Sequence, residues 1–230
     1  MILVKNNQAV GWALFRRSYT LIFIRISTKR RSALDKPDIT LKKVDEIVDV
    51  AGRLFSQKGY DATSLKEIAE HVGLHKTSLF HYFKNKESVL MEVMDKSLKE
   101  HLHILDEIVN DSHLTGKEKF RLALEKQVLV TCKYKDHINV YLTEVRSLSP
   151  ANQKKCIKRR KQYEAYFEKI IREGQAESKS DLFKGLDPTI VNLGILGMCN
   201  WIIKWYYEAG RLKPEEIFDI FYKLLTGSKD

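Results

Sequence analysis

The sequence predicts an all-α protein with two folded parts, a three-helix N-terminal domain and a C-terminal helical bundle. Within residues 63–86, Ala69 and Gly73 have the four-residue spacing that a helix-turn-helix requires. Beyond Glu87, apolar residues recur at helical spacing without strand-like alternation. Helix starts in the C-terminal half are marked by Pro150, Pro188 and Pro214. We therefore expect an extension at residues 1–40, the first domain at 41–86 and the bundle at 87–230.

Residues 1–40 are expected to form a basic, flexible extension, since eight Lys and Arg residues separate its short apolar runs. Arg16 and Arg17 interrupt the apolar core that a signal peptide needs, and no run is long enough to cross a membrane. Two interpretations stay open. The extension is either a passive tail, such as one that results from an upstream start codon, or a basic arm that adds contacts to nucleic acid.

The first expected helix covers residues 41–58, where apolar side chains recur every three or four positions and form one face. These are Val44, Ile47, Val48, Ala51, Leu54 and Phe55. After a tight corner at residues 59–61, Ser64 and Glu67 match the S-x-x-E capping box that starts a second helix. Gly73 stands where that helix must end in a left-handed turn.

A third short helix is expected at about residues 76–82. Apolar residues around the turn would lock it against the second helix, namely Ile68, Val72, Leu74, Leu79 and either Tyr82 or Phe83. Its outward positions carry side chains that can donate to bases or phosphates, namely Lys76, Thr77, Ser78 and His81. An ordinary amphipathic hairpin would explain neither the alanine-to-glycine spacing nor the donor-rich first turn. The pattern therefore favours DNA binding.

This part of the chain resembles the TetR family of transcriptional regulators. The shared motif consists of Ala51, Leu54, Phe55, Gly59, Tyr60, Thr63, Ile68, Ala69, Gly73, Leu79, Phe80, Tyr82, Phe83, Lys86 and Glu87. The resemblance implies that Thr63 lies near the phosphate backbone and that the other DNA contacts come from Lys76, Thr77, Ser78, His81, Tyr82 and Lys86. Two positions depart from the family pattern. His75 replaces a serine that caps a helix better, and Phe80 replaces a tyrosine whose hydroxyl can reach a phosphate.

The charge of the chain is unevenly distributed. Its formal net charge is +10, and residues 1–90 contain 16 Lys and Arg against 9 Asp and Glu. Such a surplus attracts duplex DNA in a salt-sensitive way, although solubility alone explains it equally well. The three cysteines are widely spaced, which suits a reducing cytoplasm.

The motifs of an enzyme or a metal protein are missing from the sequence. It has neither a G-x-S-x-G motif nor a Walker-type glycine loop. His101 and His103 are two residues apart on an expected helix and therefore point away from each other. We expect no catalytic residue, no metal and no cofactor apart from a regulatory ligand.

Six further helices are expected at residues 87–110, 116–135, 137–148, 150–178, 188–209 and 214–225. The helix at 188–209 is apolar nearly all round, which indicates burial on more than one side. Its Asn192, Asn200 and Lys204 argue against a membrane span, and its two glycines, Gly194 and Gly197, would let another helix approach closely. In the TetR family the last two helices pair with their copies. The resemblance therefore implies a homodimer that reads a palindromic operator.

A second resemblance concerns the ligand. The segment 200–217, which contains Trp201 and Trp205, looks like the C-terminal part of acyl-CoA-responsive TetR members, the FadR-like and KstR-like regulators. Six cationic residues at 154–161 precede an apolar half-helix and would suit the phosphates of coenzyme A. The candidate ligand-binding residues are Arg146, Lys158, Arg159, Trp201 and Trp205. Each candidate has an alternative. Trp201 and Trp205 could belong to the core or to an interface, and the basic cluster could be a solvated face or touch DNA. Arg146 could form an internal salt bridge with the nearby Glu144.

Together these features predict a cytoplasmic, homodimeric repressor that binds double-stranded operator DNA, without a membrane partner. A small-molecule effector, an acyl-CoA of fatty-acid or related lipid catabolism, would release it by shifting the helix at 87–110 and changing the separation of the two recognition helices. The alternative is a TetR-type regulator of multidrug efflux that binds lipophilic drugs. A non-specific architectural protein is a further alternative, and it would bind all duplexes with similar affinity.

Overall fold

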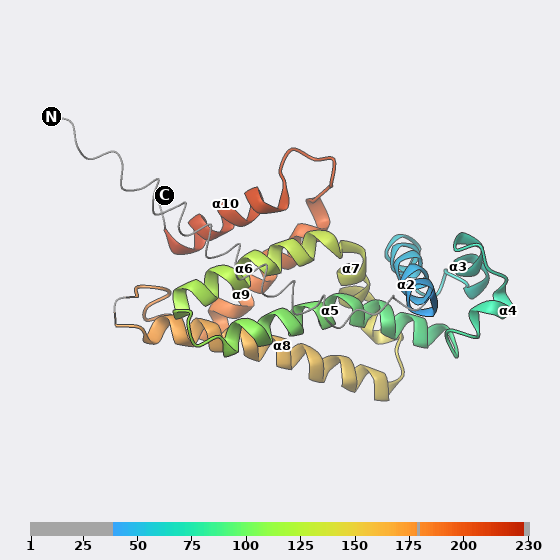
Figure 1. Cartoon of the computed structure of the whole chain (residues 1–230), viewed down its shortest axis with the longest axis horizontal. Coiled ribbons are helices and arrows are strands. Elements are labelled where there is room, and N and C mark those ends of the chain that lie inside the picture. Colours follow the sequence, from blue (N-terminus) through green and yellow to red (C-terminus); the bar gives the residue numbers. More distant parts are fainter. Residues whose placement is uncertain (1–38, 179, 228–230) are drawn as a thin grey trace. The chain divides into compact units, whose positions relative to one another are not determined.

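A computed structural model describes residues 39–178 and 180–227, and these residues form nine α-helices and one 3₁₀ turn (Figure 1). The elements are α2 (Ile39–Lys58), α3 (Leu65–His71), α4 (Lys76–Leu79), α5 (Lys86–Asn110), α6 (Gly116–Lys133), α7 (Lys135–Glu144), η1 (Val145–Ser147), α8 (Pro150–Ala176), α9 (Pro188–Trp205) and α10 (Pro214–Thr226). The all-α prediction is confirmed. By its contacts the chain divides into two units at the boundary between Lys43 and Val44. The predicted extension lies outside the described residues except for its last two.

The turn between α3 and α4 has the geometry that its glycine predicts. Gly73 adopts a left-handed φ of 67°. Its N–H donates to the carbonyl of Glu70 at 3.2 Å, and the N–H of Leu74 donates to the carbonyl of Ala69 at 2.8 Å. These two bonds form a Schellman motif that ends α3. Leu79 is fully buried and holds α4 against the other helices of the domain.

The predicted capping box at the start of α3 is only half formed. The N–H of Glu67 donates to the Ser64 hydroxyl at 3.1 Å. The Glu67 carboxylate turns away from the cap because it pairs with Lys58 at the end of α2, and this bond lowers the pKa of Glu67. A complete capping box is present instead at α5, where Asn85 and Ser88 accept from each other's backbone N–H groups.

The hydrophobic core of the first three helices continues into the rest of the chain. Four residues of α5 are fully buried in it, and α7, the loop after η1 and the start of α8 contribute one residue each. The members beyond α4 are Phe83, Val89, Leu90, Val93, Met94, Val140, Leu148 and Cys156. The core therefore does not stop at the predicted boundary between residues 86 and 87.

The C-terminal helices form a bundle in which α5, α6, α8 and α9 lie side by side (Figure 1). α10 packs on α6, and α7 contacts both α5 and α9. The centre of the bundle consists of large apolar side chains that are fully buried, among them Phe120, Leu124, Phe167, Ile170, Ile171 and Ile195. Burial of each such side chain contributes about 1.5–3 kcal/mol to stability.

Most helix starts agree with the prediction, and the larger differences are at helix ends. α7 ends at Glu144 and is followed by the 3₁₀ turn η1. Pro150 restricts Ser149 to extended backbone, so no helix continues from η1 into α8. α9 ends at Trp205 and not at residue 209. Tyr206 turns to extended backbone there, which buries its side chain to 8% exposure.

α6 and α8 approach each other closely at two glycines, Gly116 and Gly174. A Cβ atom on Gly116 would lie 2.4 Å from the backbone nitrogen of Gly174. At the same end of the bundle, the Lys119 ammonium donates to the Val109 carbonyl at 2.9 Å and pairs with Glu173 at 2.8 Å. The glycines thus allow the contact that places this buried ion pair.

Replacement of Gly116 by alanine is expected to lower the free energy of unfolding by about 1–3 kcal/mol, because the new methyl group overlaps the backbone of α8. Chemical denaturation of the full-length protein measures this change. The control is Lys117→Ala, an exposed neighbour in the same turn, which is expected to change stability by no more than about 0.5 kcal/mol. Equal stability of the two variants would contradict the close approach of α6 and α8.

Candidate DNA-binding and effector sites

α4 presents the donor-rich surface that the sequence predicts. Lys76, Thr77 and His81 are exposed, and Ser78 is half-buried. Leu79, on the opposite side, is fully buried in the core. Hydrophobic packing therefore fixes one side of this short segment while ammonium, hydroxyl and imidazole groups remain available for base edges and phosphates.

The segment after α4 differs from the predicted recognition helix. Regular α-helix ends at Leu79, and the next residues continue as a tight turn in which the N–H of His81 donates to Ser78 at 3.2 Å. The ring of Phe80 is 48% exposed, so the departure from tyrosine removes a hydroxyl from an accessible position. Tyr82 is half-buried and packs on the core. Lys84, which the sequence motif did not single out, is exposed just beyond this turn.

His75 occupies the N-cap position of α4. Its backbone is extended, with φ −74° and ψ 149°, as an N-cap residue requires, but its side chain makes no capping hydrogen bond. This agrees with the prediction that histidine caps the helix less well than the family serine. The start of α4 therefore lacks one interaction that its neighbour α3 obtains from Ser64.

Two residues that the resemblance placed at DNA have internal contacts. Thr63 is only 1% exposed, and its hydroxyl donates to the Gly59 carbonyl at 2.9 Å. Its side chain closes the corner before α3, and the position of Thr63 near the phosphate backbone stays a prediction. The Lys86 ammonium lies 4.1 Å from the centroid of the Tyr60 ring. Burial lowers the pKa of Lys86, although nearby carboxylates oppose this effect.

The basic residues of α8 fall into two groups. Arg159 pairs with the buried Asp95 of α5, and Arg160 pairs with Glu164 on its own helix. Arg159 therefore holds α8 against α5. The other four are exposed and have no carboxylate partner within the described part of the chain, namely Lys154, Lys155, Lys158 and Lys161. They leave a cationic surface on this half of α8.

Arg146 lies on the surface, and its contact with the polar head of the ligand stays a prediction. It is exposed in η1. No ion pair joins Arg146 to Glu144 among the described residues. The Glu144 carboxylate accepts from the Tyr60 N–H at 3.3 Å and from the Ser147 hydroxyl at 2.8 Å. Glu144 thus connects the end of α7 to the corner that precedes α3.

α9 has one exposed apolar face within a single chain, whereas the sequence indicated burial on more than one side. Trp201 is 65% exposed and Trp205 is 40% exposed, so neither tryptophan lines the interior of the bundle. The same face includes Ile190, Leu193, Gly194 and Gly197. Among the described helices, α9 included, none is long and apolar enough to cross a membrane.

A buried polar cluster lies inside the bundle, and no sequence motif pointed to it. The Tyr163 hydroxyl of α8 donates to the side-chain oxygen of Gln127 on α6, and the ring of His101 on α5 meets the Tyr163 ring edge-on at 5.4 Å. Burial lowers the pKa of His101 to about 4, so its imidazole is neutral at pH 7. Nδ1 of that ring donates to the Ser97 carbonyl at 2.9 Å. Two acceptor atoms of the bundle interior, Nε2 of His101 and Oδ1 of Asn192, have no hydrogen-bond partner among the described residues.

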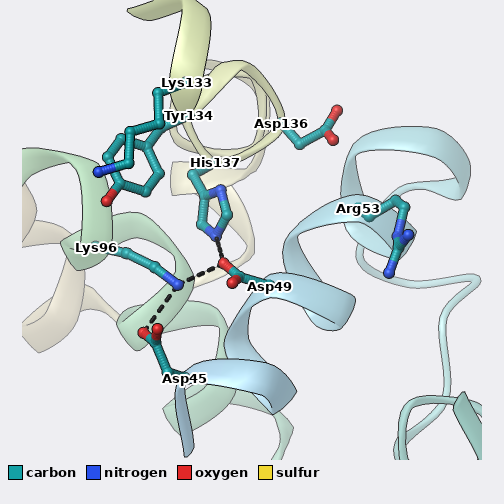
Figure 2. Close-up of a pocket in the computed structure, with 8 residues that line it drawn as sticks. All are labelled: Asp45, Asp49, Arg53, Lys96, Lys133, Tyr134, Asp136 and His137. Atoms are coloured by element: carbon teal, nitrogen blue, oxygen red, sulfur yellow. Dashed lines mark hydrogen bonds and ion pairs between the residues drawn. The ribbon is translucent and has the colours of Figure 1, made fainter. Parts of the chain in front are cut away.

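An open pocket of about 520 Å³ lies among α2, α5 and α7 (Figure 2). All of its lining residues carry a titratable group, and they are Asp45, Asp49, Arg53, Lys96, Lys133, Tyr134, Asp136 and His137. Over residues 39–178 and 180–227, no three or more His, Cys, Asp or Glu side chains are grouped so that they could hold a metal ion.

The fold and the exposed surface of α4 define a DNA-binding regulator of the helix-turn-helix class. Two family models match the chain. Bacterial regulatory proteins of the tetR family match residues 47–93, and the tetracyclin repressor-like C-terminal domain matches residues 113–228. The chain belongs to the TetR family of transcriptional regulators.

Several relatives cover most of the chain. The HTH-type transcriptional repressor KstR2 of Mycolicibacterium smegmatis is 26% identical over 204 residues, which are 85% of this chain and 94% of that protein. The TetR family regulator PfmR from Thermus thermophilus is similar in structure with a TM-score of 0.71 and 28% identity, over 81% of this chain and 100% of PfmR. AibR, solved in complex with isovaleryl coenzyme A and operator DNA, has a TM-score of 0.69 and 27% identity, over 80% of this chain and 98% of AibR.

Replacement of His75 by serine is expected to raise the free energy of unfolding by about 0.5–1 kcal/mol, because the extended backbone at this position lets a serine hydroxyl accept from the first turn of α4. Thermal or urea denaturation measures the gain. His75→Ala removes the imidazole without supplying an acceptor and serves as the control. If His75→Ala stabilised the protein as much as the serine variant does, the gain in stability could not be attributed to a new capping hydrogen bond.

Proposed function

We propose that this TetR family member is a repressor that binds a palindromic operator as a homodimer and is released by an acyl-CoA. Membership in the TetR family makes the protein a DNA-binding transcriptional regulator. The dimer, the symmetry of the operator and the effector are what we propose beyond this. The observation that carries the proposal furthest is that one chain has both an exposed apolar face on α9 and, on α8, a cluster of exposed lysines without a carboxylate partner among the described residues.

The apolar face of α9 supports a dimer. Its residues recur every three or four positions along the helix and therefore form one stripe, which consists of Ile190, Leu193, Gly194, Gly197 and Trp201. A Cβ atom built on either glycine would meet no atom within 4 Å, so the stripe has room for another helix at its centre. α10 adds Ile220 and Leu224, which are 51% and 71% exposed. A surface of this kind is typical of an interface between subunits.

A dimer also accounts for the single helix-turn-helix in each chain. Two copies related by a twofold axis present two recognition segments to half-sites about 34–36 Å apart. Each copy contributes its own Lys76, Thr77 and His81, which are exposed. Specific binding then depends on the separation of the two copies, and an effector that changes this separation lowers the affinity for the operator.

Trp201→Glu is expected to weaken dimerisation by about 2 kcal/mol or more, because it replaces a large aromatic side chain of the proposed interface with a charged one. Sedimentation equilibrium over a range of protein concentrations measures the change. Leu142→Glu is the matched control, since Leu142 is an exposed apolar residue of α7, 49% exposed, outside the stripe. A wild-type chain that stays monomeric at high concentration, or equal weakening by both variants, would contradict the α9 interface.

The lysine cluster of α8 supports an anionic effector. Lys154, Lys155, Lys158 and Lys161 lie on a helix whose other half is buried through Phe167, Ile170 and Ile171. Such an arrangement suits a ligand with several phosphates at one end and an apolar chain at the other. Coenzyme A thioesters have this character, and one relative, AibR, was solved with isovaleryl coenzyme A.

The buried polar cluster supports a polar group on the part of the effector that enters the bundle. Tyr163 and Gln127 are hydrogen-bonded to each other there, and the His101 ring stacks edge-on against Tyr163. Unpartnered acceptors in an apolar interior are costly. The acyl chain and thioester of an acyl-CoA cannot donate a hydrogen bond, but the amide N–H groups of its pantetheine arm can. Such a donor to His101 or Asn192 would therefore gain binding energy.

Acyl-CoA thioesters are expected to raise the melting temperature of the full-length protein, because a ligand that binds only the folded state stabilises it by mass action. The panel includes isovaleryl-CoA, acyl-CoAs of increasing chain length, the matching free acids, coenzyme A and cationic lipophilic drugs. Lys158→Glu is expected to weaken the apparent affinity about tenfold through loss of a charge-assisted contact. Lys169→Glu is the control on the same helix, outside the cluster and 55% exposed.

The outcomes separate the candidate effectors. A shift with acyl-CoAs that depends on chain length and is absent with the free acids supports the proposal. A shift with cationic drugs and none with any acyl-CoA would instead favour a regulator of multidrug efflux. If Lys158→Glu and Lys169→Glu weaken the apparent affinity equally, the lysine cluster is not part of the effector site. The class of effector would be unaffected by that result.

A further inference from the structure

Two buried acceptor atoms of the bundle interior lie beside the same turn of α8. The His101 ring of α5 meets the Tyr163 ring edge-on at 5.4 Å, and the Asn192 amide of α9 donates to the backbone carbonyl of Glu164 at 3.0 Å. His101 is 7% exposed and Asn192 is 2% exposed. Nε2 of the imidazole and Oδ1 of the amide have no hydrogen-bond partner among the described residues. α5 and α9, which both pack on α8 (Figure 1), therefore each bring one unsatisfied group to residues 163–164.

Both unsatisfied atoms can only accept a hydrogen bond. Nδ1 of His101 donates to the Ser97 carbonyl at 2.9 Å. Burial lowers the pKa of this imidazole to about 4, although hydrogen bonds to backbone carbonyls and the nearby Glu100 carboxylate oppose the effect. The ring therefore has one proton at pH 7, on Nδ1, and a lone pair on Nε2. The bond from Asn192 to Glu164 likewise fixes the amide so that its oxygen is the unpartnered atom.

The other side chains of the cluster use their hydroxyl protons on one another. The Tyr163 hydroxyl donates to the side-chain oxygen of Gln127, and the Thr131 hydroxyl donates to the backbone carbonyl of Gln127 at 2.7 Å. The Gln127 amide donates in turn to the Thr131 hydroxyl oxygen at 3.3 Å. A carboxylate would meet acceptors here and no positive charge from these side chains. The site therefore favours an uncharged ligand group that donates hydrogen bonds.

The acceptors stand between two chemically different parts of α8. The lysine cluster of residues 154–161 precedes them, and the buried apolar residues Phe167, Ile170 and Ile171 follow them. An acyl-CoA has the same order of groups, since two amide N–H groups of its pantetheine arm separate the phosphates from the acyl chain. Cationic, accepting and apolar side chains thus follow one another along the helix as phosphates, donors and apolar chain do along the ligand.

The spacing along α8 agrees with this order. Residues 163–164 lie five or six positions beyond Lys158, which is about 8–9 Å along the helix axis. In pantetheine the two amide nitrogens are five and nine bonds from the phosphate oxygen, or roughly 6 and 11 Å at the ~3.6 Å that three such bonds span when extended. Phosphates held at the lysine cluster would therefore bring the two N–H groups to the depth of the buried acceptors.

Given the proposed acyl-CoA effector, on which this assignment rests, we infer that His101 and Asn192 bind the two amide N–H groups of the pantetheine arm. These residues recognise the carrier that all coenzyme A thioesters share, and the apolar residues beyond them contact the acyl chain. Because both side chains are buried, the arm reaches them only when helices of the bundle move apart. Recognition of the carrier is thereby linked to the movement that releases the operator.

The test is a calorimetric titration of the full-length protein with thioesters that contain two, one or no amide N–H groups. Their acyl group is that of the acyl-CoA with the largest effect on the melting temperature, and their thiols are pantetheine, N-acetylcysteamine and methanethiol. His101→Phe and Asn192→Leu are each expected to weaken binding of the pantetheine thioester roughly fivefold to tenfold, the loss of one hydrogen bond. With the cysteamine thioester only one of the two variants is expected to retain an effect, and with the methyl thioester neither.

The stability of the ligand-free variants separates binding residues from structural ones. His101→Phe and Asn192→Leu each remove an unsatisfied buried acceptor, so their melting temperatures are expected to equal or exceed that of the wild type. Gln127→Leu leaves the Tyr163 hydroxyl without its acceptor and is expected to lower the melting temperature by about 2–6 °C. His103→Phe makes the same change at an exposed position of α5 and is expected to bind every thioester as the wild type does.

The outcomes distinguish this assignment from the proposed effector. A wild type that binds the acyl-CoA, with variants that weaken all three thioesters equally or none of them, would overturn the assignment and leave the effector standing. Destabilisation of His101→Phe and Asn192→Leu as large as that of Gln127→Leu would overturn it as well, since both residues would then be structural. A wild type that binds no acyl-CoA would refute the effector itself, and the assignment with it.

Discussion

One continuous hydrophobic core holds the helix-turn-helix to the bundle, and the placement of every functional surface depends on it. Val89, Leu90, Val93 and Met94 of α5 are fully buried among the side chains of α2, α3 and α4, and α7 and α8 contribute to the same cluster. Close-packed interiors resist gradual deformation and pass displacement on to their neighbours. The DNA-binding helices therefore have no free hinge at residue 86. A change in the bundle would reach them through packed side chains and through three polar contacts. Asp49 contacts α5, Tyr60 contacts α7, and Glu87 contacts the start of α8.

Much of the fold could be predicted because its determinants are local. The starts of α8, α9 and α10 depend on a proline at the first helical position, and the end of α3 depends on the left-handed backbone of one glycine, Gly73. The buried face of α2 follows from helical periodicity. The exposure of Lys76 and Thr77 follows in turn from the burial of Leu79 within the same short helix.

The contacts that could not be predicted join residues that are distant in the sequence or depend on the folded backbone. The motif position of Thr63 is the same whether its hydroxyl donates to a phosphate or to the Gly59 carbonyl. The hydrogen bond to Gly59 is seen only in the folded structure. Arg159 looked like one cation among six, yet it is the one that a buried carboxylate, Asp95, engages. The spacing between His101 and His103 bears only on metal binding. It does not predict that His101 is buried beside Tyr163.

The exposure of α9 illustrates a different limit of sequence reasoning. A helix that is apolar on all sides predicts burial, but periodicity does not say whether the covering surface belongs to the same chain. Within one chain Trp201 remains 65% exposed, while Ile195, Cys199 and Ile202 on the opposite side are buried. The helix thus has two apolar faces, one that packs on α6, α7 and α8 and one that a single chain leaves exposed.

The length of α5 has a consequence for the sensitivity of the protein. A helix of 25 residues extends about 37 Å, at about 1.5 Å per residue. A tilt of about 5° at one end would move the other end by roughly 3 Å on this length. That is close to the rise of about 3.4 Å between neighbouring base pairs. His101 lies 15 residues from the N-terminal end of α5, or about 22 Å, so a tilt of about 5° centred there would move that end by roughly 2 Å, more than half of one base-pair step. In the proposed dimer, a small angular change would therefore be sufficient to put the two half-sites out of phase.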